Sequence, residues 1–221
     1  MGKFITGPGA RAAGGAFFDI TITGKGAHGA HPNQSIDPVL VACHLGTALQ
    51  SIVSRNISAR ESGVLSITRI QSGDAYNVIP QTAVMAGTVR TLNRETMTLI
   101  QGNMERLTKS IAAGFGAEAS LDFRVIFAPM INNEAEAQAY GDAAAGLVGE
   151  ENIDRHTPPG MGSEDFSFMM EQVPGAHINL GNGDSAALHN HKYDFNDETI
   201  PYGVALYGSI VEKKLPKGQV D

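Results

Sequence analysis

The first clear pattern in the chain is an alternation of hydrophobic and polar residues over residues 17–23. Alternation with a period of two predicts a strand with one buried face. Residues 64–70, 83–91 and 119–127 have a similar strand-like composition and predict three further strands. Turn-forming residues separate the strands, so each one is expected to end where its pattern ends.

Two segments between these strands carry hydrophobic residues at helical spacing. Asp37 followed by Pro38 predicts the start of the first helix, and Asn93 predicts the start of the second. Gly116 is placed to end the second helix. The resulting order, strand-helix-strand-strand-helix-strand, predicts a ferredoxin-like α+β unit: a four-stranded antiparallel sheet with two helices on one face.

The pattern changes after Pro129, where helices alternate with short strands as in an α/β layer. This second part has too few strands to form a sheet of its own, so we expect it to complete a sheet begun elsewhere or to lean on the first unit. The predicted divisions are a connector over residues 1–16, the ferredoxin-like unit over 17–128 and an α/β portion over 129–221. The elements expected in the last portion are helices at 134–148 and 199–215 and short strands at 153–156 and 176–180.

Composition narrows the functional classes. The net charge of the 221 residues is −7 and no basic cluster is present, which argues against nucleic-acid binding. No apolar run approaches the ~18 residues needed to span a bilayer, so we expect no membrane partner. The single cysteine, Cys43, excludes an intrachain disulfide and fits a reducing, cytoplasmic compartment.

The stretch from Leu180 to Asp197 concentrates turn-forming residues with His189, His191 and several carboxylates. Imidazoles and carboxylates close together suit a metal site or an acid/base site. A polar surface loop with two solvated histidines has the same composition. The stretch alone leaves both interpretations open.

Three other segments carry candidate chemistry. His28 lies in GKGAHGAHP, where an imidazole can donate to a developing oxyanion. Asn77 in GDAYNVIP and Arg90 in GTVRT can hold a substrate carboxylate or carbonyl group. The segment GMGSED, with Gly162 and Ser163, precedes a predicted helix and suits an anion. Taken singly, each residue can equally belong to a turn, a helix cap or a charged surface.

Taken together, the segments resemble the M20 metallopeptidase family. GKGAHGAHP, IDPV, ALQSIVSRN, GDAYNVIP, GTVRT, MGSEDFSF and LHNHKYDFND occur in the family's order over essentially the whole chain. The match is closest to the amidohydrolase branch of hippurate hydrolases and indole-acetyl-amino-acid hydrolases. The resemblance implies a catalytic α/β domain with a paired metal site, zinc or manganese, and an inserted ferredoxin-like lid that often mediates homodimerisation.

The resemblance also implies roles for individual residues. His28 matches the lid histidine that reaches the substrate carbonyl group, typically in the partner subunit's active site. Asn77 and Arg90 match positions that hold the substrate carboxylate, and Gly162 and Ser163 lie where a loop lines the substrate pocket. His189 matches the last metal ligand. His191 stands where the family often has proline and is not expected to be a ligand.

The family's other metal ligands and its general-base glutamate lie in motifs that this sequence does not contain. Those motifs belong to a part of the catalytic domain that begins well before the equivalent of Met1. Cys43 cannot replace the family's ligand cysteine, because it lies in a predicted lid helix. A dinuclear hydrolytic site needs several ligands and a base, so we expect this chain not to assemble one alone.

Two hypotheses follow. In the first, the chain is the C-terminal part of an M20-type amidohydrolase that cleaves N-acyl amino acids, small hippurate-like molecules, with two divalent metals per complete site. In the second, it is a non-catalytic module that dimerises or binds carboxylated ligands.

Overall fold

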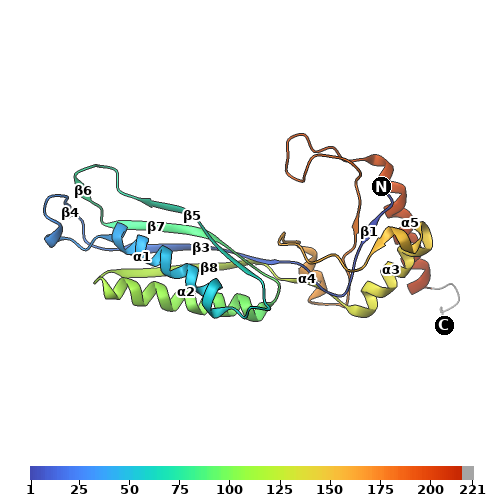
Figure 1. Cartoon of the computed structure of the whole chain (residues 1–221), viewed down its shortest axis with the longest axis horizontal. Coiled ribbons are helices and arrows are strands. Elements are labelled where there is room, and N and C mark those ends of the chain that lie inside the picture. Colours follow the sequence, from blue (N-terminus) through green and yellow to red (C-terminus); the bar gives the residue numbers. More distant parts are fainter. Residues whose placement is uncertain (216–221) are drawn as a thin grey trace. The chain divides into compact units, whose positions relative to one another are not determined.

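The computed structural model describes residues 1–215 and contains two compact units (Figure 1). We call the first the sheet unit; it comprises Ala12–Pro129 and Met161–Asp165. The second, the mixed unit, comprises Met1–Arg11, Met130–Gly160 and, of the described residues, 166–215. Each unit is described by itself below.

Four long strands form the sheet unit's main sheet: β3 (Gly14–Thr23), β5 (Gly63–Ser72), β7 (Thr82–Thr91) and β8 (Glu118–Phe127). Their spatial order is β5-β7-β3-β8, and every neighbouring pair is antiparallel. The alternation in β3 predicts its burial well, because Phe18, Ile20 and Ile22 are all buried. The strands predicted from sequence lie within these four.

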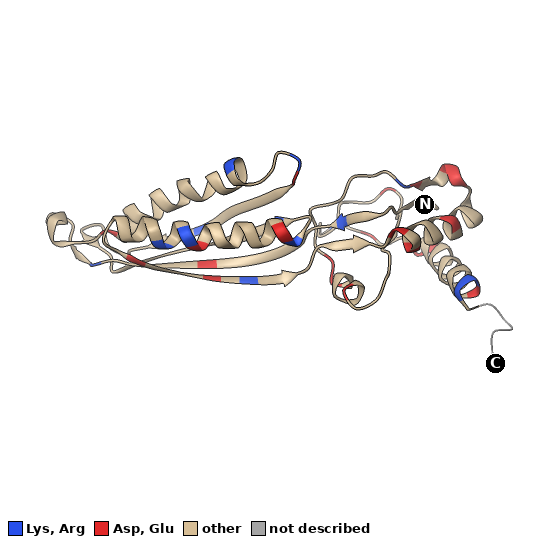
Figure 2. Ribbon diagram, turned by 90° about the horizontal axis from the view of Figure 1, so that it is seen from below, with Lys and Arg blue, Asp and Glu red and all other residues tan. Residues whose placement is uncertain are grey.

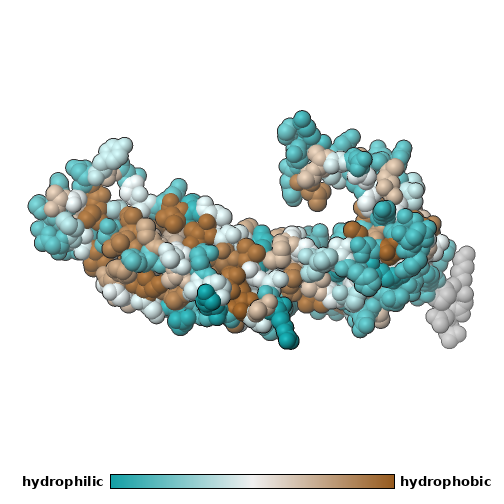
Figure 3. Space-filling view, in the orientation of Figure 1, coloured by the Kyte–Doolittle hydropathy of each residue, from teal (hydrophilic) through white to brown (hydrophobic). Residues whose placement is uncertain are grey.

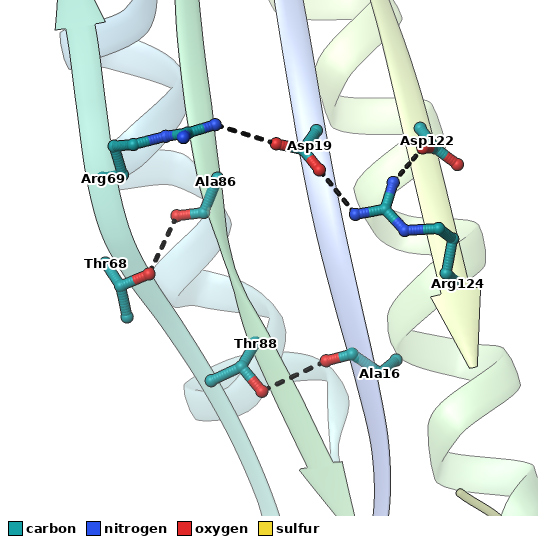
Figure 4. A network of polar contacts seen from close by, with 8 residues as sticks. All are labelled: Ala16, Asp19, Thr68, Arg69, Ala86, Thr88, Asp122 and Arg124. Carbon is teal, nitrogen blue, oxygen red and sulfur yellow. Dashed lines mark hydrogen bonds and ion pairs between the residues drawn. The ribbon is translucent and has the colours of Figure 1, made fainter. Parts of the chain in front are cut away.

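Two helices cover the face of the sheet that carries these buried residues: α1 (Pro38–Ser51) and α2 (Arg94–Gly114). A π-helical turn, Ile52–Asn56, directly follows α1. The side chain of Asp37 accepts two backbone N–H bonds at the start of α1, and Asn93 accepts one at the start of α2, as the sequence predicts. The opposite face of the sheet carries Asp19, Arg69 and Arg124, as Figure 4 shows with both helices behind the strands. Acidic and basic residues are interspersed along α2 (Figure 2).

A small ribbon lies beyond one end of this sheet. Strand β4 (Ala27–His28) pairs antiparallel with β6 (Val78–Ile79), and a short 3-10 turn, Pro32–Gln34, follows β4. The ribbon joins the segment after β3 to the segment between β5 and β7, so two distant parts of the sequence meet there (Figure 1).

The mixed unit contains short strands only. Strand β1 (Phe4–Ile5) lies between β10 (Ile153–Asp154), to which it is parallel, and β11 (Asn179–Leu180), to which it is antiparallel. A second pair joins β2 (Gly9–Ala12) and β9 (Met130–Asn132). These strands are two to four residues long, which is less than an independently stable sheet normally has.

Three helices accompany these strands: α3 (Glu134–Val148), α4 (Phe166–Met170) and α5 (Ile200–Lys214). The 3-10 turns Glu150–Asn152 and Asp197–Thr199 follow α3 and precede α5. The buried cluster between α3, α5 and β1 is small, with Phe4 and Leu206 as its large members. None of the helices among residues 1–215 is long and apolar enough to cross a membrane.

Residues 1–16, predicted to be a connector, contain β1, β2 and the start of β3. Glycine and alanine dominate this segment and give no periodic pattern, so pairing with strands far along the chain determines its conformation.

Candidate functional site

His28 and Asn77 lie together in the β4–β6 ribbon. The ribbon pairs His28 with Val78, and the backbone N–H of Gly29 donates to the carbonyl oxygen of Asn77 at 2.7 Å. The N–H of Ala30 donates to Nδ1 of His28 at 3.0 Å. A neutral imidazole whose Nδ1 accepts a hydrogen bond carries its proton on Nε2. Nε2 of His28 is therefore the donor that this geometry offers to a ligand.

Arg90 and Ser163 lie together around Gly15, where β3 and β7 are paired. A Cβ built on Gly15 would stand 2.9 Å from the Ser163 hydroxyl oxygen and 3.1 Å from Nη1 of Arg90. Both contacts are closer than ordinary packing allows, so glycine is what lets the two polar groups share this space. Among residues 1–215 the buried Ser163 hydroxyl has no hydrogen-bond partner.

The arginine is held by its own strand. Nη1 of Arg90 donates to the carbonyl oxygen of Val89 at 2.9 Å and also contacts the Thr88 hydroxyl. The ring of Phe17 lies 5.9 Å from the guanidinium carbon, within cation–π range. Gly162 joins the same region, because its carbonyl oxygen accepts the N–H of Ala13 at 2.8 Å. A fixed guanidinium beside an unpartnered hydroxyl suits a carboxylate.

These two pairs lie at opposite ends of one sheet. Gly15 pairs with Arg90 at one end of β3, and Thr23 pairs with Thr82 at the other. The eight residue steps from Gly15 to Thr23 span about 26 Å at ~3.3 Å per residue, and the β4–β6 ribbon lies beyond Thr23. One copy of the sheet unit cannot place His28 and Arg90 on the same small molecule.

His189 lies in the mixed unit, in the loop between β11 and α5. Its φ is 65°, a left-handed conformation that is uncommon outside glycine. The carbonyl oxygen of Asp194 accepts bonds from the side chains of Asn182 and Ser185, at 2.8 and 3.0 Å, and these bonds hold the two sides of the loop together. Asn196 caps the turn before α5.

The His, Cys, Asp and Glu side chains of the described residues do not form a metal site by themselves. Within residues 1–215, no group of three or more His, Cys, Asp or Glu side chains could hold a metal ion. A paired-metal site with His189 as a ligand therefore needs donors beyond those that the described residues gather. Cys43 is exposed on α1, in the sheet unit.

A cavity of about 440 Å³ in the mixed unit contains none of the predicted site residues. Its wall includes Arg155, which bonds Glu150 and Asp142 at 2.9 Å each. The guanidinium lowers the pKa of Glu150, and Glu150 raises that of Arg155. Hydrogen bonds from Thr157 and the His156 backbone lower the pKa of Asp154. These ion pairs fix the chain after α3, which is a structural role.

Sequence reasoning missed Gly15 and Thr88. Thr88 lies in the GTVRT segment with Arg90 but carries no signal of its own contact with it. Gly15 matters only through the register that sets it beside Arg90. The one available signal was a glycine just before the alternating segment of residues 17–23, since glycine inside a strand often marks a close approach.

Comparison with known proteins finds relatives over nearly the whole chain. The sequence pattern of Peptidase family M20/M25/M40 matches residues 5–213. N-acetylcysteine deacetylase of Bacillus subtilis is 37% identical over 87% of this chain and 50% of its own length. Hippurate hydrolase of Campylobacter jejuni is 34% identical over 96% of this chain and 56% of its own.

The solved structures that resemble this chain include a member of the same family. A dinuclear metal binding peptidase of the M20 family from Bacillus subtilis superimposes with a TM-score of 0.80 at 28% identity, over 97% of this chain and 53% of that one. The chain thus spans about half the length of the relatives that it matches. With a match over residues 5–213, this chain belongs to the M20 peptidase family, whose relatives here are hydrolases of N-acyl amino acids.

Proposed function

We propose that the chain is part of a metal-dependent amidohydrolase that cleaves the amide bond of small N-acyl amino acids. The observation that carries the proposal is the Gly15 cradle, in which Arg90 and the unpartnered Ser163 hydroxyl share one space. An N-acyl amino acid has a free α-carboxylate, and this cradle has the charge and the donor to bind one. Relatives named for N-acetylcysteine and hippurate support the same substrate class.

We assign the sheet unit to the family's ferredoxin-like lid. The strand order β5-β7-β3-β8, with both connecting helices on one face, supports this assignment. In this assignment Arg90 and Ser163 hold the substrate carboxylate with Gly162 beside them, and Nε2 of His28 donates to the substrate carbonyl oxygen. A positioned donor of this kind stabilises the negative charge that develops on that oxygen.

The separation of the two half-sites requires two copies of the chain. His28 and Asn77 lie beyond the end of β3 that is about 26 Å from Arg90, whereas an N-acyl amino acid is much shorter. We therefore propose a homodimer in which each site combines Arg90 and Ser163 of one copy with His28 and Asn77 of the other.

We assign the mixed unit to one half of the family's catalytic α/β domain. Its helix α5 buries only Leu206, while Val204, Tyr207 and Val211 are more than half exposed. A helix that is apolar on all sides is normally buried on all sides. The half of the relatives' length that this chain does not match supplies a partner for this surface and the further donors that zinc or manganese needs beside His189.

Turnover tests the proposal. The chain is produced together with the unmatched half of the Campylobacter jejuni hippurate hydrolase, and release of amino acid from N-acetyl and N-benzoyl amino acids is measured with zinc or manganese added. We expect hydrolysis by the assembled pair and none by either half alone. Amides without a free carboxylate serve as control substrates, and equal turnover of those amides contradicts the role given to Arg90.

The Gly15→Ala substitution in the assembled enzyme should weaken substrate binding. Its Cβ displaces the Arg90 guanidinium and the Ser163 hydroxyl, so we expect KM to rise about tenfold with kcat nearly unchanged, as for lost uniform binding. Steady-state kinetics measure both constants. The matched control is Gly102→Ala on α2, where a Cβ meets nothing within 4 Å; it should leave KM unchanged and stabilise the helix by about 0.5–1 kcal/mol.

A non-catalytic ligand-binding module is the second candidate. The missing metal cluster within residues 1–215 favours it, and the Gly15 cradle can bind a carboxylate without any metal. The two candidates differ in the assembled pair, because a module binds N-acyl amino acids there without hydrolysing them.

A further inference from the structure

Phe17 is a large apolar side chain on the open face of the sheet, beside the Gly15 cradle. It is 46% exposed, whereas its neighbours along β3, Ala16 and Phe18, are buried against the helices. The centre of its ring lies 5.9 Å from the guanidinium carbon of Arg90. Exposed apolar side chains occur at many places over the sheet unit (Figure 3), so exposure alone does not distinguish Phe17. Its position beside the cation of the cradle does.

The strands on either side of Phe17 hold polar side chains that already have partners. Thr88 on β7 and Arg124 on β8 are paired with Phe17 across the sheet. The Thr88 hydroxyl donates to the β3 backbone at 3.1 Å (Figure 4). The Arg124 guanidinium turns to Asp19, which it binds at 2.6 Å, and also binds Asp122. The charge of Arg124 is thus compensated by two carboxylates and is not available to a ligand at the ring.

A second apolar side chain lies on the other side of Arg90. Val64 on β5 is paired with Arg90 on β7. Arg90 is paired in turn with Gly15, two residues before Phe17 on β3. Directly paired residues of antiparallel strands place their side chains on the same face, so Val64 and Arg90 share the open face with Phe17. Val64 is 38% exposed. The cation of the cradle therefore lies between two apolar side chains that a ligand can reach.

The covalent geometry of an amino acid brings its side chain to this surface. The side chain and the α-carboxylate share one carbon atom, so a carboxylate held by Arg90 places the first side-chain atoms next to the guanidinium. A side chain the size of leucine then reaches the Phe17 ring, 5.9 Å from the guanidinium carbon. The N-acyl arm has another destination, because in the proposed function its carbonyl group is held at His28 and the metal. The side chain is therefore the part of the substrate that contacts Phe17.

An apolar side chain suits this surface better than a charged one. Contact with Phe17 and Val64 removes apolar area of both molecules from water, which stabilises the complex. A carboxylate in the side chain competes with the α-carboxylate for Arg90, and an ammonium group stands beside a like charge there. Either charged group also loses hydration against the ring, which costs binding free energy.

We propose that Phe17, with Val64 beside it, determines which amino acid the substrate carries. The pair selects N-acyl derivatives of apolar amino acids, such as leucine, methionine and phenylalanine, over those of aspartate and lysine. This inference rests on the proposed function, which gives Arg90 the α-carboxylate, and it extends that function from N-acyl amino acids in general to the apolar ones.

The test compares N-acetyl-leucine, N-acetylaspartate and N-acetylglycine as substrates of the assembled enzyme. In kcat/KM, the wild type should prefer N-acetyl-leucine to N-acetylaspartate by about tenfold or more. Phe17→Ala should lower kcat/KM for N-acetyl-leucine about tenfold, as for a lost apolar contact, and leave that for N-acetylglycine nearly unchanged. N-acetylglycine has no side chain, so it reports any displacement of Arg90 itself.

Two further variants complete the test. Phe17→Leu keeps an apolar side chain and should retain most of the preference for N-acetyl-leucine over N-acetylglycine. Thr21→Ala is the matched control, because Thr21 is exposed on the same face of β3, four residues from Phe17; it should leave the preference unchanged.

Equal losses for N-acetyl-leucine and N-acetylglycine in Phe17→Ala overturn the proposal, because the ring then only supports Arg90. A wild type that prefers N-acetylaspartate overturns it as well. An assembled enzyme that hydrolyses none of the three removes the proposed function, and calorimetry on the 221-residue chain then decides the inference. N-acetyl-leucine should bind more tightly than N-acetylglycine, and Phe17→Ala should abolish the difference. Equal affinities, or binding of neither, overturn the role of Phe17.

Discussion

In the assembled enzyme, His28→Ala should lower kcat by about 10²- to 10³-fold, the usual effect of removing one oxyanion donor. Nε2 of His28 is the donor that the Ala30 hydrogen bond leaves available, and its charge stabilisation is needed only in the transition state. KM should change little. His31→Ala is the local control, because its ring lies 5.6 Å from that of His28 and has no assigned role.

A mixture of two inactive variants should regain activity. Arg90→Ala removes the carboxylate anchor from one half-site, and His28→Ala removes the donor from the other. Random pairing makes half of all dimers mixed, and each mixed dimer has one site with both residues intact and one with neither. The mixture should therefore recover about one quarter of wild-type turnover. Mixing His28→Ala with the double variant should recover nothing, and recovery absent from both mixtures rules out a site shared between copies.

The free energy of local unfolding should differ widely between the two units. The sheet unit buries a continuous core from four strands and two helices, including Phe18, Ile20 and Ile100. The mixed unit buries a small cluster and leaves α5 largely exposed. We expect backbone amides of β3 and β7 to exchange about a thousandfold more slowly than those of α3 and α5, which corresponds to about 4 kcal/mol.

Hydrogen exchange followed by mass spectrometry measures this difference. Assembly with the unmatched half of a relative should slow exchange in α5 while leaving β3 and β7 unchanged, because burial of the exposed apolar face stabilises only the mixed unit. Similar protection in both units of the isolated chain contradicts the assignment of the mixed unit as half a domain.

The strands and helices of the sheet unit are predictable from sequence for a physical reason. One face of β3 is fully buried, and the other is polar from Asp19 onward, so the residues of this part must alternate. The caps at Asp37 and Asn93 are local hydrogen bonds between neighbouring residues, and local sequence is sufficient to predict them. Alternating burial and helix capping each involve residues that are close in the sequence, so the local sequence pattern is sufficient to predict them.

Other features depend on long-range pairing. Strand β1 has two residues and exists because Ile153 and Leu180 lie on either side of Phe4. His28 and Asn77 meet through a two-residue ribbon, and no periodicity marks it. The resemblance to a family identified His28, Asn77, Arg90, Ser163 and His189 as candidates, but only the register of β3 with β7 places Gly15 at the centre of the Arg90 cradle.

The central claim is that this chain carries one part of a paired-metal hydrolytic site and depends on further residues for the rest. Metal content tests it most directly, measured by mass spectrometry on the purified chain and on its assembly with the unmatched half of a relative. We predict no stoichiometric metal on the chain alone and about two ions per assembled unit, with His189→Ala reducing the assembled value. Two ions bound by the 221 residues alone, with turnover, would contradict the account.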